Sequence, residues 1–145
     1  MPQAIIFDWI GTLVDRNNGP YSWSKEVLST LSPKYRLGLI SKRSDPEKGR
    51  MELEKFGLSE YFDSVVIARR KTIAEFIKCM NQLDVSHAGT HVVGDRTIRE
   101  IRIGNQIGCT TYWIQRGEHS HELPNRRTGE PSYRINSVKD LLEIL

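Results

Sequence analysis

The residues of this chain that could do chemistry follow four short apolar runs. Asp8 comes after the first run, Ser41 ends the second, the basic group 69–71 lies after the third, and Asp95 follows the fourth with Glu100 five residues later. Mg²⁺ is usually held by one or two carboxylates together with water and a substrate phosphate. A serine hydroxyl and a lysine can bind and neutralise phosphate oxygens. These residue types indicate phosphoryl chemistry, with Asp8 available for in-line attack and an aspartyl-phosphate that water hydrolyses.

Strands alternating with amphipathic helices must position these residues. Short apolar runs predict strands at residues 4–7, 35–40, 64–68, 91–93, 110–114 and 133–135. Apolar residues at helical spacing predict helices over residues 22–31, 46–56, 72–83, 98–107 and 138–145. Strands that are apolar on both faces need helices on both sides of a parallel sheet. We therefore expect a three-layer, doubly wound, mainly parallel α/β fold that gathers the polar residues at one sheet edge.

Local signals refine these elements. Asp45 before Pro46 predicts a cap and a first helical residue, and Ser22 is a candidate cap for the first helix. The polar stretch 115–131 predicts an irregular or mobile surface loop. The buried face of the helix at 72–83 is predicted to consist of Ile73, Phe76, Ile77, Met80 and Leu83.

The polar residues also form four ordered motifs. The hexapeptide 8–13 follows an apolar strand, Ser41 ends a second strand, Lys71 follows a third, and the run 92–95 is followed by Glu100. These motifs, in this order, resemble those of the haloacid dehalogenase superfamily, and the resemblance extends from residue 4 to about residue 117. It implies a Rossmann-like core, magnesium dependence and an aspartate nucleophile, which would be Asp8.

The resemblance also implies the roles of the other site residues. Ser41 and Lys71 match the family's phosphate-binding hydroxyl and lysine, and we place Gly11 and Thr12 with them as substrate-binding residues. The metal ligands would be Asp8, the backbone carbonyl of Ile10, Asp95 and Glu100.

Two positions depart from the family pattern. Thr72 replaces the proline that usually follows the third-motif lysine, so Arg70 is an alternative to Lys71. Ile10 replaces the aspartate that protonates the leaving oxygen in the family's phosphatases and later activates water. General acid–base catalysis is typically worth ~10²–10⁴ in rate, or about 3–5 kcal/mol of barrier. A good leaving group, another residue or a bound water would have to compensate for the acid–base catalysis that Ile10 cannot provide.

The length of 145 residues predicts one domain spanning residues 1–145. Segments 14–37 and 42–70 leave no room for the large cap domains of many family members. We therefore expect an open, capless site that suits a small phosphorylated substrate or a phosphorylated macromolecule, or that a second copy of the chain covers. Only segments 9–21 and 115–131 could supply specificity.

Composition excludes several classes of protein. The net charge of +3 is too small to predict nucleic-acid binding by itself. The sequence contains no targeting signal and no apolar run of membrane-spanning length, so we expect a cytoplasmic protein without a membrane anchor. Cys79 and Cys109 are too far apart for a CxxC pair and predict ordinary thiols in the core or at the surface.

Other conspicuous residues have simple interpretations. The arginines at 96, 99 and 102 could form a basic stripe for an anionic partner, although we favour a solvated helix face. His119 and His121 lack a third ligand for a metal site, so we expect surface residues. Trp9 could shape a pocket rim, whereas Trp23 and Trp113 are expected in the core.

Two hypotheses follow. The first is a magnesium-dependent hydrolase of phosphate monoesters that acts through an aspartyl-phosphate at Asp8. The second, favoured by Ile10 alone, is a catalytically impaired module that binds phosphate or protein. The retained residues Asp8, Ser41, Lys71 and Asp95 favour the enzyme, because a binding module has little need of all four.

Overall fold

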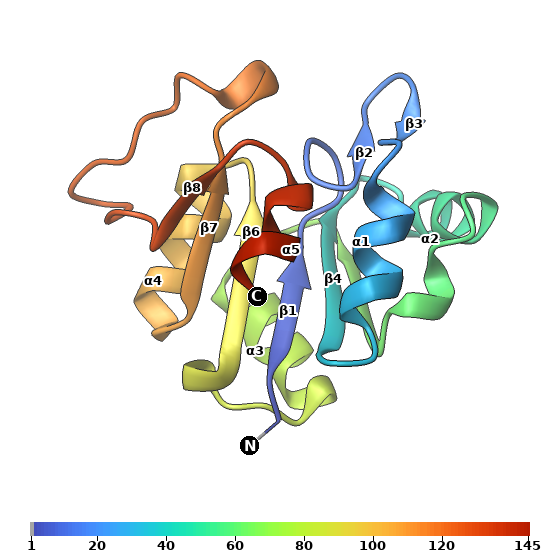
Figure 1. Cartoon of the computed structure of the whole chain (residues 1–145), viewed down its shortest axis with the longest axis horizontal. Helices are drawn as coiled ribbons and strands as arrows, with labels where there is room; N and C mark the ends of the chain where they lie inside the picture. Colours follow the sequence, from blue (N-terminus) through green and yellow to red (C-terminus); the bar gives the residue numbers. More distant parts are fainter. Residues whose placement is uncertain (1) are drawn as a thin grey trace.

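The computed structural model describes residues 2–145, which are built around a six-stranded parallel sheet (Figure 1). The strands are β1 Ala4–Phe7, β4 Arg36–Lys42, β5 Ser64–Ala68, β6 Thr90–Gly94, β7 Thr110–Ile114 and β8 Tyr133–Ile135. Their order across the sheet is β5-β4-β1-β6-β7-β8. Because β1 pairs with β4 on one side and β6 on the other, the chain order reverses at β1. The residue after β1, Asp8, thus occupies the position where open α/β sheets bind ligands.

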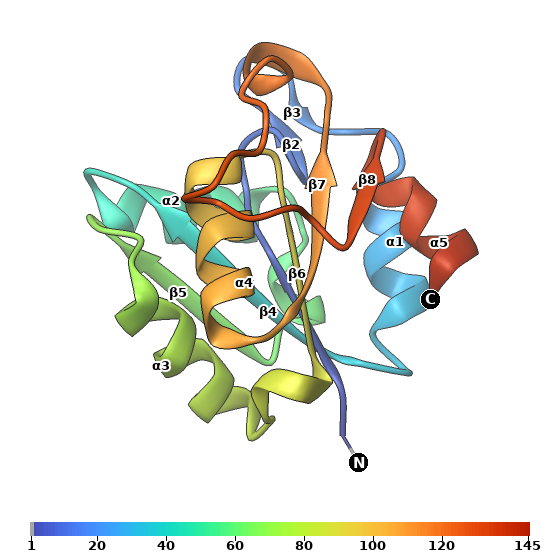
Figure 2. The same cartoon turned by 90° about the vertical axis from the view of Figure 1, so that its left-hand side faces the viewer.

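Helices cover both faces of the sheet (Figure 2). Residues of α1 Ser24–Leu31, α2 Pro46–Lys55 and α5 Leu141–Ile144 pack with Ile5 and Phe7 of β1 in one core cluster. Residues of α3 Ile73–Leu83 and α4 Arg102–Ile107 pack with Ala4 and Ile6 in a second cluster. Alternate residues of β1 therefore contribute to opposite cores, as strand geometry requires. The predicted three-layer, doubly wound α/β fold is confirmed.

The helix ends follow the capping signals in part. Asp45 caps α2 and accepts a hydrogen bond from the backbone N–H three residues later. Thr72 caps α3 in a reciprocal capping box with Glu75. The predicted cap at Ser22 is wrong, because α1 begins at Ser24 and no side chain caps it.

The buried face of α3 also differs from the prediction. Ile73 and Ile77 are 41% and 46% exposed, while Cys79 takes a place on the inner face with Phe76, Met80 and Leu83. The helix approaches β4 so closely at Gly38 that a Cβ there would overlap the Cys79 sulfur. The inner face of α3 therefore includes Cys79, and Ile73 and Ile77 lie on its exposed side. Both cysteines are buried free thiols.

Several local features were not predicted. A small antiparallel hairpin, β2 Val14–Asp15 and β3 Gly19–Pro20, follows the turn after β1. A π-helical turn, Thr97–Ile101, precedes α4, and a 3₁₀ turn, Val138–Asp140, precedes α5.

The connections after β1 and β4 are short. Within residues 2–145 they contain the β2/β3 hairpin, α1, α2 and a 3₁₀ turn at Ser59–Tyr61, and no inserted cap. Among the same residues, no helix has both the length and the apolar character needed to span a bilayer.

Candidate active site

A pocket of about 380 Å³ lies at the carboxyl edge of the sheet, above β4, β1 and β6. Four of the predicted site residues with charged side chains or hydroxyls line it directly: Asp8, Ser41, Lys71 and Asp95. Glu100 lies behind them, within ion-pair distance of Lys71. The structure therefore brings together side chains that lie at the carboxyl ends of four different strands or just after them.

Asp8 is the first residue after β1, and backbone and side-chain hydrogen bonds fix its position. The Asp8 N–H donates to the Val93 carbonyl at 3.1 Å, which continues the pairing with β6. Thr12 is buried and its hydroxyl donates to Asp8 Oδ2 at 3.4 Å, so it contacts the nucleophile candidate rather than the pocket. Gly11 has a φ of +85°, and a Cβ at this position would overlap the Asp95 carboxylate.

We predict that Gly11→Ala costs about 2–4 kcal/mol of stability, because it combines unfavourable backbone strain with displacement of the Asp95 carboxylate. Gly57→Ala is the matched control, since Gly57 has a φ of +69° and no atom within 4 Å of an added Cβ. Backbone strain alone predicts a cost of about 1 kcal/mol there. Urea denaturation of both variants measures the difference, and equal costs would show that Asp95 does not confine Gly11.

Three carboxylates converge beside the pocket. Asp8, Asp95 and Glu100 each offer an oxygen within 4.8 Å of the others, and Asp95 and Glu100 are only 4% and 1% exposed. The π-helical turn carries Glu100, and the backbone N–H of Arg96 donates to its carboxylate at 3.3 Å. Gly94 makes room for it, because a Cβ there would overlap the Glu100 side chain.

Lys71 is the basic residue of the group 69–71 that enters the site. Its Nζ lies 2.7 Å from Asp8 Oδ1 and 2.9 Å from Glu100 Oε2, and its side chain is 2% exposed. Arg70 is exposed at the surface instead. Burial alone would lower the pKa of Lys71, but the carboxylates of Asp8 and Glu100 raise it above its ordinary value. Lys71 therefore remains an ammonium ion in the site.

One ammonium does not balance three carboxylates. Two negative charges are left over when all three acids are ionised. Burial, and next the charge of Asp8, raise the pKa values of Asp95 and Glu100 well above those of free carboxyl groups. Glu100 Oε2 is buried and, apart from its ion pair with Lys71, has no hydrogen-bonding partner among residues 2–145. Hard oxygen donors with this excess charge fit a divalent cation such as Mg²⁺.

Comparison with known proteins agrees with this geometry. A family model described as haloacid dehalogenase-like hydrolase matches residues 5–114. The chain belongs to this family. A glyceraldehyde 3-phosphate phosphatase from Methanopyrus kandleri is 27% identical over 99 residues, which are 65% of this chain and 42% of that protein. The pyrimidine 5'-nucleotidase PynA from Streptococcus pneumoniae is 31% identical over 99 residues, which are 64% and 40% of the two proteins.

The haloacid dehalogenase-like fold extends over nearly the whole chain. A crystal structure of a HAD phosphatase from Thermococcus onnurineus superposes with a TM-score of 0.80 at 18% identity, and the match covers 98% of this chain and 97% of that one. The chain spans about two fifths of the length of the two curated relatives.

Ile10 and residues outside the family motifs complete the pocket walls of this haloacid dehalogenase-like chain. Segment 9–21 contributes Ile10 and Arg16, and segment 115–131 contributes Glu118 and His119. The remaining wall residues are Lys42, Ser44, Arg96 and Arg99. The two segments that could supply specificity therefore both reach the pocket, and Arg16 joins them by an ion pair with Glu118 at 2.8 Å.

The predictions about the conspicuous histidines, arginines and tryptophans are confirmed only in part. His121 is exposed and His119 is partly exposed, as expected of surface residues, and His119 in addition lines the pocket. Arg96 pairs with Glu122 and Arg99 lines the pocket, so they do not share one solvated face with the exposed Arg102. Trp9 is a core residue and not part of the rim, because it is buried in the cluster beneath β1. Trp113 is buried as predicted, whereas Trp23 is only partly buried.

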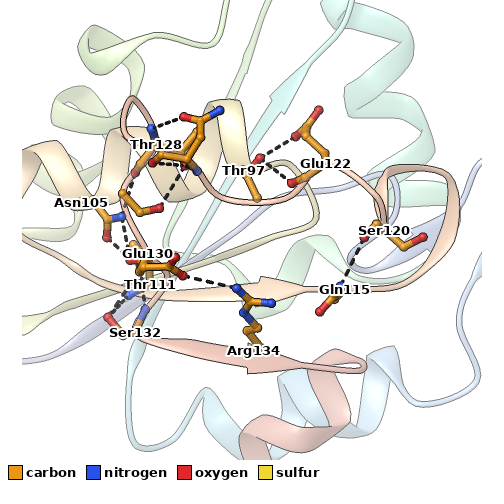
Figure 3. Close-up of polar contacts among 12 residues, drawn as sticks. Thr97, Asn105, Thr111, Gln115, Ser120, Glu122, Thr128, Glu130, Ser132 and Arg134 are labelled. Atoms are coloured by element: carbon orange, nitrogen blue, oxygen red, sulfur yellow. Dashed lines mark hydrogen bonds and ion pairs between the residues drawn. The ribbon is translucent and has the colours of Figure 1, made fainter.

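Hydrogen bonds tie the late loop to the rest of the domain (Figure 3). Asn105 of α4 donates to the backbone carbonyls of Thr128 and Glu130 at 2.9 and 3.0 Å. Thr97 donates to the Glu122 backbone carbonyl at 2.9 Å, and the Glu122 carboxylate accepts from Arg96. These contacts, from the elements that follow Asp95, position the segment that brings Glu118 and His119 to the pocket.

We predict that Glu122→Ala costs about 2 kcal/mol, because it leaves the partly buried Arg96 without its carboxylate partner. Glu130→Ala is the control. Its carboxylate forms an exposed ion pair with Arg134, so its loss is expected to change stability by less than about 0.5 kcal/mol. Chemical denaturation measures the loss of stability in both variants. A loss in Glu122→Ala as small as that in Glu130→Ala would show that Glu122 does not hold the late loop in place.

Proposed function

We propose that this chain hydrolyses phosphate monoesters in a Mg²⁺-dependent reaction with Asp8 as the nucleophile. The observation that carries the proposal is the cluster of Asp8, Lys71, Asp95 and Glu100 at the pocket, in which one ammonium faces three carboxylates. The names of the two curated relatives, a phosphatase and a nucleotidase, support the same substrate class.

The proposed reaction proceeds in two steps. The Asp8 carboxylate attacks phosphorus, which forms an aspartyl-phosphate as the bond to the alcohol oxygen breaks. Water then attacks the phosphorus of the acyl phosphate, which releases inorganic phosphate and restores Asp8. Lys71 compensates charge on the transferring group, and Ser41, at the end of β4, donates its hydroxyl to a phosphate oxygen.

The residues that would hold Mg²⁺ are Asp8, Asp95 and Glu100, together with the backbone carbonyl of Ile10. When bound there, the ion supplies neutralisation of phosphate charge. Ile10 lines the pocket and offers no proton to the leaving alcohol. Esters with acidic leaving groups, such as aryl phosphates, are therefore expected to react faster than alkyl phosphates.

The direct test measures phosphate release from an aryl phosphate by purified protein, with Mg²⁺ and with excess EDTA. The proposal expects turnover that EDTA removes and that added Mg²⁺ restores. Turnover that is equally fast in EDTA would contradict the metal dependence.

Lys71→Met is predicted to reduce turnover by about 10²-fold or more and to destabilise the metal-free protein by about 3 kcal/mol. The substitution keeps the length of the side chain but leaves the carboxylates of Asp8 and Glu100 buried without their cation. Added Mg²⁺ is expected to recover part of the lost stability, because it replaces the missing positive charge.

Arg70→Met is the matched control for this variant, since Arg70 is the exposed neighbour that the family pattern left as an alternative. Its stability and turnover are expected to remain close to those of the unmodified protein. If Arg70→Met were the more damaging of the two substitutions, the assignment of Lys71 would be wrong.

A second candidate function rests on Ile10. A chain that retains the acid cluster and lacks the second aspartate could bind phosphate groups without hydrolysing them. This alternative expects Mg²⁺-dependent binding of a phosphate mimic together with no turnover of any monoester.

A further inference from the structure

Basic side chains beyond Lys71 surround the pocket. Arg16, Lys42, Arg96 and Arg99 all line it, and Glu118 is the only wall acid among residues 2–145 besides Asp8 and Asp95. These cations come from four places: the loop of the β2/β3 hairpin, the end of β4, the residue just before the π-helical turn after β6, and that turn itself. A positive wall assembled from separate elements attracts an anion to the space that it encloses.

Two of these four cations already have partners. Arg16 lies 2.8 Å from Glu118, and Arg96 lies 3.0 Å from Glu122. Lys42 and Arg99 have no ion-pair partner in the part of the chain that the structure describes. Lys42 is exposed and Arg99 is half-buried, so both can meet a ligand that enters from solvent.

Both residues line the pocket, and each is the sequence neighbour of a residue assigned to the proposed site. Lys42 follows Ser41 directly at the end of β4, and Arg99 precedes Glu100 directly in the π-helical turn. The transferring phosphate has its own partners in Lys71, Ser41 and the metal ligands. A simple monoester with an uncharged alcohol would therefore leave Lys42 and Arg99 without an anionic partner.

We infer that the pocket takes an organic bisphosphate, with one phosphoryl group at Asp8 and the second bound by Lys42 and Arg99. The inference rests on the proposed function for the position of the first group. An arginine presents a planar fork of N–H donors that suits phosphate oxygens, and a lysine adds a point charge. Because the first phosphoryl group is the one transferred to Asp8, the second belongs to the alcohol part that leaves.

The test compares fructose 1,6-bisphosphate with fructose 1-phosphate and fructose 6-phosphate as probes that differ by one phosphoryl group. Dissociation constants are measured calorimetrically with Mg²⁺ at low salt, on the Asp8→Asn protein so that turnover does not interfere. We expect the bisphosphate to bind at least about tenfold more tightly than either monophosphate. This preference is expected to shrink as the salt concentration rises, because partly exposed charges are screened.

In the double variant Lys42→Gln, Arg99→Gln in the same background, the bisphosphate and the monophosphates are expected to have similar dissociation constants, so that their ratio is close to one. Arg50→Gln, which removes an exposed arginine of α2 outside the pocket, is expected to keep the ratio. Equal binding of the three sugar phosphates, or a preference that survives the double variant, would overturn the inference.

Turnover of the unmodified protein separates this inference from the proposed function. If the bisphosphate preference is present and depends on Lys42 and Arg99 but no phosphate is released, the second anion site stands and the proposed hydrolysis fails. If aryl phosphate is hydrolysed but no preference exists, the hydrolase stands and the second site is wrong.

Discussion

Asp8→Asn is expected to lose Mg²⁺-dependent phosphate release down to the background rate, a loss on the order of 10⁴-fold or more. Asparagine keeps the size of the side chain and one oxygen, which can accept from Lys71 as Asp8 Oδ1 does, while its amide NH2 replaces the Oδ2 that accepts from Thr12. It cannot form the acyl phosphate in the way that a carboxylate does. The measurement is initial phosphate release from an aryl phosphate, with circular dichroism to verify folding.

Asp84→Asn is the matched control. Asp84 is exposed at the end of α3 and has a φ of 53°, a conformation that asparagine also tolerates. Its turnover is expected to equal that of the unmodified protein. An Asp8→Asn protein that is folded and still hydrolyses the ester at the original rate would contradict the assignment of the nucleophile.

Ile10→Asp is expected to increase turnover of alkyl phosphates by about 10²–10⁴-fold, because it supplies the general acid and base that the chain lacks. The gain should be smaller for aryl phosphates, whose leaving oxygen needs less protonation. Ile10 packs against the core cluster while lining the pocket, so a stability loss of about 1–2 kcal/mol is expected with it.

Ile10→Asn distinguishes the effect of proton transfer from the effect of a more polar side chain. Asparagine has the size of aspartate but no ionisable group. It is expected to show the same stability loss and no gain in rate. Equal rates for the two variants would mean that position 10 cannot act as an acid in this pocket. Turnover that is absent in the natural chain and present only in Ile10→Asp would favour the binding-module alternative.

The central part of the site could be predicted because it depends on strand order. Asp8, Ser41 and Asp95 each lie at the end of an apolar run, and parallel strands bring such ends to one edge. The six strands themselves were recognisable because buried strands of a parallel sheet consist of short runs of apolar residues. At β4 and β6 the strand ends differ by one or two residues, most at β4, where pairing with β5 continues through Lys42 and places Ser41 inside the strand.

The pocket walls could not be predicted in the same way. The ion pair between Arg16 and Glu118 joins residues 102 positions apart, through two segments without periodic structure. The interpretation of Arg96 and Arg99 as a solvated face assumed regular helical spacing, and the π-helical turn changes that spacing. His119 gave no indication of a place at the pocket, because two histidines in a polar loop without a third ligand predict no site.

Lys71 and Arg70 are adjacent, so sequence alone left both as candidates. Thr72 occupies the position of the missing proline, and as the cap of α3 it fixes where the helix begins. The side chain just before it is buried between Asp8 and Glu100. Burial of a cation is tolerable only with such partners, and the sequence did not show which of the two basic side chains the acidic cluster would enclose.

Thermal unfolding with Mg²⁺ and beryllofluoride, a phosphate mimic that attaches to aspartate, tests the central claim most directly. The account predicts that the two together raise the Tm of the unmodified protein well beyond Mg²⁺ alone, because the mimic binds only the folded site. In Asp8→Asn the additional increase is expected to disappear, while Asp84→Asn is expected to retain it. An equal increase in Asp8→Asn, or no increase in the unmodified protein, would contradict a site built around Asp8.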